Sequence, residues 1–185
     1  MTPLNQFVTR RLIATRLTEH HFAELCRMHS DPVVMATLAG CKTDEQTREL
    51  LEANLAHWAN NDFGLWVLRD RINGQFAGRG GLRRVMANGQ PEVEVAYALM
   101  SEFWGRGLAT EFAAACVAIA REHLGLEQLV CFTLPTNQAS QRVMQKVGFQ
   151  FEQDGTHASL PHVFYRITTE RMQEHVAAEC YRLDC

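Results

Sequence analysis

The sequence predicts a mixed α/β fold, in which helices pack on both faces of a central sheet. Apolar and polar residues alternate in several short segments, and two Asn-Gly pairs mark turns next to segments of this kind. Helical spacing then replaces the alternation after residue 99. Because an antiparallel block is followed by a strand–helix–strand unit, we expect a mostly antiparallel sheet of about seven strands with one parallel pair.

The elements of the first part follow from caps and turns. Thr18 is placed to cap a helix that Ser30-Asp31-Pro32 ends, Thr43-Asp44-Glu45-Gln46 has the form of a capping box, and Asn73-Gly74 is a hairpin turn signal. The predicted elements are a strand at Leu12–Leu17, a helix over about Glu19–His29, a helix from the capping box to about Asn60, and hairpin strands at Phe63–Leu68 and Gln75–Val85.

The second part begins with a strand at Glu92–Leu99, after the turn signal Asn88-Gly89. Alternation puts Val93, Val95, Tyr97 and Leu99 on one face of this strand and Glu92, Glu94, Ala96 and Ala98 on the other. The later predicted elements are a helix at Leu108–Leu124 ended by Gly125, a strand at Leu126–Leu134, a helix at Asn137–Val147 followed by Gly148, and strands at Phe149–Glu152 and Val163–Thr168.

Length and charge limit the classes of protein. The 185 residues suit one domain over 1–185, with residues 170–185 as a C-terminal helix or tail. A net charge of −3 argues against a nucleic-acid-binding protein. The longest apolar run, Phe112–Ala120, is far shorter than the roughly 18 residues of a membrane span, and the first residues lack the apolar core of a secretory signal. We therefore expect a cytoplasmic protein without membrane partners.

The six cysteines and eight histidines show no metal-binding spacing. We expect thiols in a reducing compartment and no metal ion. Cys180 and Cys185 are close enough in sequence to cross-link or share a metal, but their spacing alone does not favour either.

The most informative segment is Ser101–Glu111, which lies between a predicted strand and helix. Gly105 and Gly107 let the backbone expose amides to a ligand, and the following helix directs its positive end to the same place. Such a loop favours a pyrophosphate. A Walker loop is excluded because no Gly-Lys pair exists, and a dinucleotide fingerprint fits poorly because Thr110 stands at the third glycine position. A simple strand-to-helix turn remains the alternative.

A second segment, Asn137–Phe149, follows the next strand and opens the next helix. Together with the glycine loop it resembles the GNAT superfamily of acyl-CoA-dependent N-acetyltransferases. Within that superfamily the chain is similar to the branch of ribosomal-protein N-terminal acetyltransferases. Further cues for this branch are Ser30–Met35, Glu94–Leu99 and Phe103–Glu111, in this order and spacing.

The resemblance implies where acetyl-CoA binds. The strand ending at Leu99 would splay from its parallel neighbour, with the pantetheine arm in the gap and the pyrophosphate on the loop amides. Asn137 would contact the pantetheine. The family pattern begins the loop with Arg or Gln, and this branch has Trp104 there. The cofactor-binding residues implied are Tyr97, Ala98, Leu99, Trp104, Gly105, Arg106, Gly107, Leu108, Ala109, Thr110 and Asn137.

The implied reaction is attack of an amine on a thioester, and it needs a base because amines with a pKa of about 8 to 10.4 arrive protonated. Glu94 is the candidate base; the alternative is a salt bridge from Glu94 to Arg83 or Arg84, and Glu92 is a weaker rival. An amide near Leu99 would stabilise the oxyanion.

The thiolate that leaves needs a proton. Many family members have a tyrosine seven residues after the asparagine, but Met144 stands there in this chain. Ser140 is therefore the candidate acid, with Tyr165 as a second possibility, and a purely local role for the Ser140 hydroxyl is the alternative.

The function expected is acetyl-CoA-dependent transfer to a primary amine, either a protein N-terminus or a small molecule, by a monomer or homodimer. A non-catalytic acyl-CoA-binding module is the alternative. The acceptor pocket implied by the resemblance, about Ala36–Lys42 and Asp154–Pro161, contains no diagnostic cluster. Gly78-Arg79-Gly80-Gly81 looks like a phosphate loop, but it lies inside a strand pattern and is better explained as a bulge or close-packing site.

Overall fold

The computed structural model describes residues 3–175 and 181–183. Its centre is an eight-stranded sheet with the order β1-β2-β3-β4-β5-β6-β8-β7. Neighbouring strands are antiparallel except for β5 and β6, which are parallel. The strands are β1 (Gln6–Val8), β2 (Leu12–Arg16), β3 (Leu65–Asp70), β4 (Phe76–Ala87), β5 (Gln90–Leu99), β6 (Gln128–Thr133), β7 (Gln150–His157) and β8 (Leu160–Thr168). The predicted mixed fold is confirmed.

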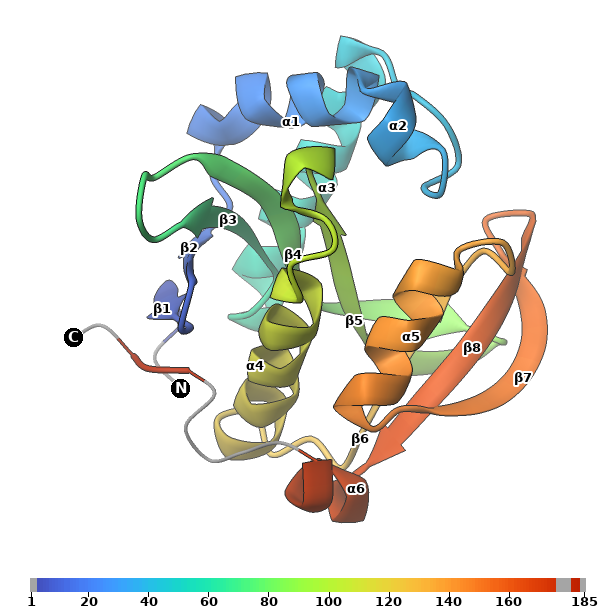
Figure 1. The fold of residues 1–185 in the computed structure, drawn as a ribbon. Helices are drawn as coiled ribbons and strands as arrows, with labels where there is room; N and C mark the ends of the chain where they lie inside the picture. The colour runs from blue at the N-terminus through green and yellow to red at the C-terminus, as the bar shows by residue number, and fades with distance from the viewer. Residues whose placement is uncertain (1–2, 176–180, 184–185) are drawn as a thin grey trace.

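Helices surround this sheet. Figure 1 shows α4 and α5 next to each other in front of it, α3 behind it, and α1 and α2 across the top. The helices are α1 (Phe22–Ser30), α2 (Pro32–Met35), α3 (Asp44–Asn61), α4 (Leu108–Glu122), α5 (Gln138–Val147) and α6 (Thr169–His175), with 3-10 turns η1 (Glu19–His21) and η2 (Ser101–Phe103). No helix in the described residues is long and apolar enough to cross a bilayer.

The Thr43 capping box forms as predicted, whereas Thr18 precedes the 3-10 turn η1, and its hydroxyl contacts His21 Nδ1 instead of a helix amide. The Thr43 hydroxyl accepts a hydrogen bond from the Gln46 amide at 3.2 Å, and the Gln46 side chain accepts one from the Thr43 amide at 3.0 Å. The Asp31 carboxylate accepts the Val33 amide at 2.8 Å, which starts α2 immediately after α1. Local side chains therefore satisfy amides that the first helical turns leave unpaired.

The structure has one strand more than expected. β1 is three residues long and pairs with β2, and its Phe7 is fully buried against the rings of Trp66 and Phe112. Val8 of β1 also bridges to Arg182 near the end of the chain. The expected C-terminal helix is α6, while Cys180 and Cys185 lie outside the described residues.

The glycines of the phosphate-like segment serve close packing, as expected. A Cβ atom on Gly80 would lie 2.4 Å from the Phe112 ring of α4 and 2.7 Å from the Ala96 carbonyl oxygen of β5. The pairing of β3 with β4 shifts register beside this segment. Gly80 therefore lets α4 lie directly on the β4–β5 hairpin, and this contact fixes the start of α4 near the end of β5.

Candidate active site

The candidate site lies where the parallel strands β5 and β6 separate. Their register joins them at Glu94 and Val130, and further along the Cys131 thiol donates a hydrogen bond to the Val95 carbonyl at 3.0 Å. Burial raises the pKa of Cys131, so the group remains a thiol that can donate. Both α4 and α5 begin beyond the carboxyl ends of these two strands, which is where parallel α/β sheets usually bind ligands.

The glycine loop has the left-handed conformation that its two glycines permit. Gly105 has φ +71° and Gly107 has φ +75°, and no atom lies within 3.4 Å of a Cβ added at either position. Glycine is needed here for the backbone conformation rather than for space. The Trp104 indole N–H donates to the Leu99 carbonyl at 2.8 Å and so ties the loop to the end of β5.

The loop presents a row of free amide groups. Within the described part of the chain, the amides of residues 105–110 have no hydrogen-bond partner, and the first bond of α4 runs from the Glu111 amide to the Gly107 carbonyl at 3.1 Å. The first turn of a helix always leaves amides unpaired, and the helix dipole adds positive charge there. This arrangement suits a phosphate-bearing ligand.

The loop is held in place by residues that the sequence analysis did not assign. Arg11 donates through Nη1 to the Arg106 carbonyl at 2.7 Å and through Nε to a Glu111 carboxylate oxygen at 2.7 Å. The Thr9 hydroxyl donates to the other Glu111 oxygen at 2.6 Å, and Arg106 lies 3.5 Å from the Asp70 carboxylate. The only signal in the sequence was an acidic residue in the first turn of a predicted helix.

These contacts predict an acid-dependent contribution to stability. Burial alone would raise the pKa of Glu111, but hydrogen bonds from Thr9 and Arg11 lower it below its ordinary value of 4.5. A lowered pKa stabilises the folded state above about pH 4.5, and the effect is lost as the pH falls through the folded-state pKa. We expect Glu111→Gln to lower the free energy of unfolding at pH 7 by about 1–3 kcal/mol, from the loss of hydrogen bonds to a charged group.

Urea unfolding at pH 7 and pH 3.5 measures this contribution. The difference between wild type and Glu111→Gln should shrink at the lower pH, whereas Glu19→Gln, an exposed residue in the first turn of η1, should change little at either. An equal loss at both pH values would mean that the carboxylate charge of Glu111 does not stabilise the loop.

On α5, the predicted residues contact one another and β5. The Asn137 side-chain oxygen accepts the Ser140 amide at 3.1 Å, so Asn137 caps the helix. The Tyr97 hydroxyl of β5 lies 3.0 Å from the Ser140 hydroxyl and donates to the Ser140 carbonyl at 3.2 Å. Burial raises the pKa of Tyr97 well above 10, so its phenol stays protonated. The family resemblance implied a role for the Tyr97 backbone alone, and the sequence carries no signal for this hydroxyl.

Tyr165, the second candidate acid, lies on β8 and contacts α5 at Gln141. Its hydroxyl donates to the Gln141 side chain at 3.2 Å, and the ring is 3% exposed. Met144 is buried as well, at 1% exposure. The structure thus joins Ser140 to Tyr97 and leaves Tyr165 with a different partner.

The opposite face of β5 holds the acidic residues, as the alternation predicts. Glu94 is 3% exposed and forms an ion pair with Arg83, whose Nε donates to the carboxylate at 2.7 Å. Glu92 accepts a hydrogen bond from Arg166 at 2.8 Å. Arg84 instead donates to the Asn61 side chain. The salt bridge weighed for Glu94 therefore exists, and its partner is Arg83 and not Arg84.

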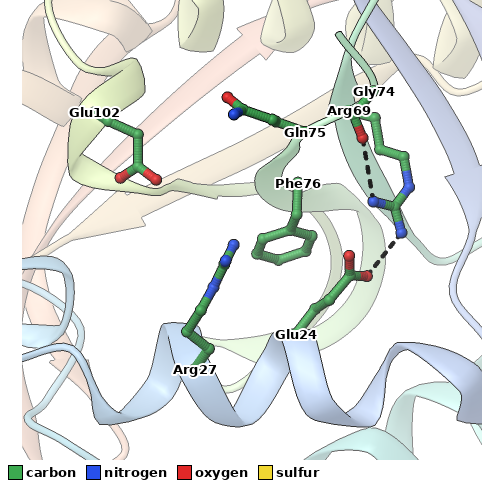
Figure 2. A pocket seen from close by; sticks show the side chains of 7 residues that line it. All are labelled: Glu24, Arg27, Arg69, Gly74, Gln75, Phe76 and Glu102. Carbon is green, nitrogen blue, oxygen red and sulfur yellow. Dashed lines mark hydrogen bonds and ion pairs between the residues drawn. The ribbon is translucent and has the colours of Figure 1, made fainter.

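A cavity of about 310 Å³ lies between α1, the β3–β4 turn and η2, which directly precedes the glycine loop. Figure 2 shows Arg69 between the Glu24 carboxylate and the Gly74 carbonyl, with Arg27 beside the Phe76 ring. None of the residues predicted for the site lines this cavity. Within the described ranges, no three His, Cys, Asp or Glu side chains are arranged to hold a metal ion.

Comparisons with known proteins agree with this geometry. The chain is 30% identical over 124 residues to the uncharacterized protein YkkB of Bacillus subtilis (strain 168), covering 67% of this chain and 72% of that protein. It is 30% identical over 149 residues to the FsC-acetyl coenzyme A-N(2)-transacetylase of Aspergillus fumigatus, covering 76% of this chain and 63% of that protein.

Among solved structures, the fold matches the aminoglycoside acetyltransferase AAC(6')-Ib in complex with coenzyme A, with a TM-score of 0.74 and 17% identity over 90% of this chain and 99% of that one. A family model described as "Acetyltransferase (GNAT) domain" matches residues 11–150, which include β5, the glycine loop and α5. This chain therefore belongs to the GNAT family of acetyltransferases.

Proposed function

We propose that the protein transfers an acetyl group from acetyl-CoA directly to a primary amine, of a small molecule or of a protein N-terminus. The observation behind this proposal is the row of unpaired amides at residues 105–110, at the start of α4 and beside the end of β5. Amides in this arrangement bind phosphate groups without needing a positive side chain. GNAT acetyltransferases use acetyl-CoA, whose pyrophosphate has the required charge.

The chain offers donors and acceptors along the path that the cofactor would follow. The loop amides from Gly105 to Thr110 would hold the pyrophosphate, the β5 backbone at Tyr97–Leu99 would pair with the pantetheine arm, and Asn137 keeps its amide nitrogen available at the start of α5. Bound acetyl-CoA supplies a thioester carbonyl that an amine can attack. A backbone amide near Leu99 would stabilise the resulting oxyanion.

Glu94 is our proposed base. The substrate amine is mostly protonated at neutral pH and must lose a proton before it attacks. The Glu94 carboxylate is buried on the face of β5 opposite Tyr97, so an acceptor that approaches from this face meets a fixed proton acceptor, directly or through water. Its Arg83 partner fixes the carboxylate in one orientation.

Ser140 is our proposed acid, with Tyr97 as its partner. The two hydroxyls are 3.0 Å apart, so the Tyr97 phenol can turn its proton from the Ser140 carbonyl to the Ser140 hydroxyl as Ser140 donates to the leaving sulfur. We expect Ser140→Ala to lower kcat about 10- to 100-fold while the KM for acetyl-CoA stays similar. Ser140→Thr, which retains a hydroxyl, should recover part of the rate.

Tyr97→Phe should lower the rate less than Ser140→Ala, because it removes the partner and not the donor itself. Initial rates of thiol release across pH 6–10 are the measurement. A Ser140→Ala enzyme with the wild-type rate would eliminate the acid role.

The proposal extends to the branch of the family, the acceptor and the location of the protein. Trp104 at the start of the loop supports the branch of ribosomal-protein N-terminal acetyltransferases, since its indole replaces a charged side chain and binds the end of β5. The amine acceptors in the names of the Aspergillus and aminoglycoside enzymes support an amine as the acceptor in general. A cytoplasmic location belongs to the same proposal.

Cofactor binding and turnover are tested separately. Calorimetry should show binding of acetyl-CoA, and free-thiol release with a panel of amines should show transfer.

Gly105→Ala should weaken binding of acetyl-CoA, because φ +71° strains any side chain there although no atom blocks it. Gly125→Ala is the matched control, with φ +61° and equally open space after α4.

No binding at millimolar acetyl-CoA would overturn the proposal. Binding without thiol release for any amine would favour the non-catalytic acyl-CoA-binding module instead.

A further inference from the structure

One arginine on the Glu94 face of the sheet lacks an acidic partner. Arg79 of β4 lies four residues before Arg83, so the two side chains project from the same face. The other arginines of the site pair with carboxylates, Arg83 with Glu94 and Arg11 with Glu111. Among the described residues, by contrast, no carboxylate lies within ion-pair distance of Arg79.

A buried histidine holds this guanidinium on one side. The Arg79 Nε donates to His29 Nε2 of α1 at 3.4 Å, and His29 Nδ1 lies 3.1 Å from the Thr47 hydroxyl of α3. His29 and Thr47 are 1% and 0% exposed. Burial lowers the pKa of His29 to about 4, and the Arg79 charge adds to this, so the imidazole is neutral at pH 7. His29 therefore orients Arg79 without neutralising it.

The contact with His29 uses only the Nε edge of the guanidinium. Neither of its two terminal nitrogens has a hydrogen-bond partner among the described residues, and neither is fully buried. Arg79 is half-buried. The edge of the guanidinium that carries these two nitrogens is thus open to a ligand, while His29 fixes the Nε edge.

The charges around Arg79 favour an anion. The positive charge of Arg83 lies close enough to lower the pKa of Arg79. The positive charge of Lys42 does the same to the pKa of His29, the partner of Arg79. Glu94 is the carboxylate that acts on Arg79, and it is already bound by Arg83. Burial lowers the pKa of Arg79 to about 10, and repulsion from Arg83 contributes, so the group stays charged at neutral pH in surroundings that do not balance it.

The position of Arg79 connects this anion site to the proposed reaction. Arg79 pairs in register with Ala98, and the neighbouring Gly78 pairs with Leu99. Those β5 residues are the ones proposed to hold the thioester end of the cofactor. The pyrophosphate has its own donors at the glycine loop, so Arg79 is available to the other substrate.

We propose that Arg79 binds a carboxylate of the acceptor, so that the acceptor is a small amino acid-like compound with both an amine and a carboxylate. This inference rests on the proposed amine acetylation. A planar guanidinium with a free edge can hold a carboxylate through two parallel hydrogen bonds. Polyamines and aminoglycosides, which carry several positive charges, would meet Arg79, Arg83 and Lys42 and be repelled.

The distance between amine and carboxylate can be measured with a series of acceptors. Glycine, β-alanine, γ-aminobutyrate and ε-aminocaproate place the two groups increasingly far apart, and the corresponding amides lack the charge. We expect kcat/KM for the best acid to exceed that of its own amide at least 10-fold in the wild type. The preferred length then reports the span from the thioester to Arg79.

Variants assign the preference to this residue. In Arg79→Gln the preference for acid over amide should fall to within about threefold, and Arg79→Lys should retain part of it. Arg84→Gln changes the charge equally on the same strand, at an exposed arginine bonded to Asn61, and should keep the wild-type preference. The melting temperature of Arg79→Gln should equal or exceed that of wild type, since the charge it removes has no acidic partner.

Several results would overturn the inference. These are equal use of acids and amides by the wild type, better use of polyamines or of phosphoethanolamine, or an unchanged preference in Arg79→Gln. If the wild type acetylates no amine at all, the proposed function fails instead. Calorimetry with N-acetylglycine and N-acetyl-γ-aminobutyrate, in the presence of CoA, then tests Arg79 alone: binding that Arg79→Gln abolishes supports it, and absence of binding to the wild type contradicts it.

Discussion

Glu94→Gln is expected to lower kcat at least 100-fold and to leave the KM for acetyl-CoA nearly unchanged. The amide keeps the shape of the side chain but cannot accept a proton from the amine, and a positioned general base commonly contributes 10²- to 10⁴-fold. Steady-state rates from pH 6 to 10, with saturating acetyl-CoA, provide the measurement.

The ion pair with Arg83 supplies the control. Arg83→Gln retains the Glu94 carboxylate, so it should keep substantial activity. The Arg83 side chain is 30% exposed and solvent weakens the pair, so we expect either replacement to lower the free energy of unfolding by about 1–3 kcal/mol. If both variants lost activity in the same proportion, Glu94 would act by holding Arg83 rather than as the base.

Gly78→Ala is expected to destabilise the protein by about 3 kcal/mol or more. Its φ of +147° strains any residue with a side chain, and the added Cβ would lie 2.2 Å from the Ala98 carbonyl oxygen and 2.8 Å from the Leu99 Cα. The backbones of β4 and β5 must separate to relieve this contact. Since Leu99 ends β5 at the candidate site, acetyl-CoA binding should weaken as well.

Gly74→Ala is the matched control for Gly78→Ala. Gly74 has φ +69° in the β3–β4 turn, and no atom lies within 4 Å of an added Cβ. This variant should therefore lose only the conformational part, about 1 kcal/mol. Urea unfolding of both variants separates strain from steric overlap, and equal losses would mean that the overlap relaxes without cost.

Elements with local signals were predictable from the sequence, and elements defined by distant partners were not. The Thr43 capping box and the Asn-Gly pairs act within a few residues, so they fixed α3 and two hairpins before any packing was known. The turn between β7 and β8 instead places Ala158 and Ser159 at positive φ, which neither residue type signals. Both strands are consequently longer than expected.

The same distinction applies to the candidate site. Gly105 and Gly107 act through their own backbone conformation, which a sequence motif can predict. The contacts of Glu111 with Thr9 and of Arg79 with His29 join residues far apart in the chain, and they exist only because α1 and α4 pack on the sheet to which β1 and β4 belong. Alternation along β5 predicted the face of Glu94 but could not choose between Arg83 and Arg84 as its partner.

The bond from the Cys131 thiol to the Val95 carbonyl makes this cysteine a chemical probe of how often β5 and β6 move apart. A buried thiol with a raised pKa reacts with alkylating reagents only during local opening, whereas the exposed Cys41 reacts at once. The rate of Cys131 labelling therefore measures the opening frequency at the cofactor end of the sheet. A ligand that bridges the two strands would slow this labelling in proportion to the fraction of protein bound.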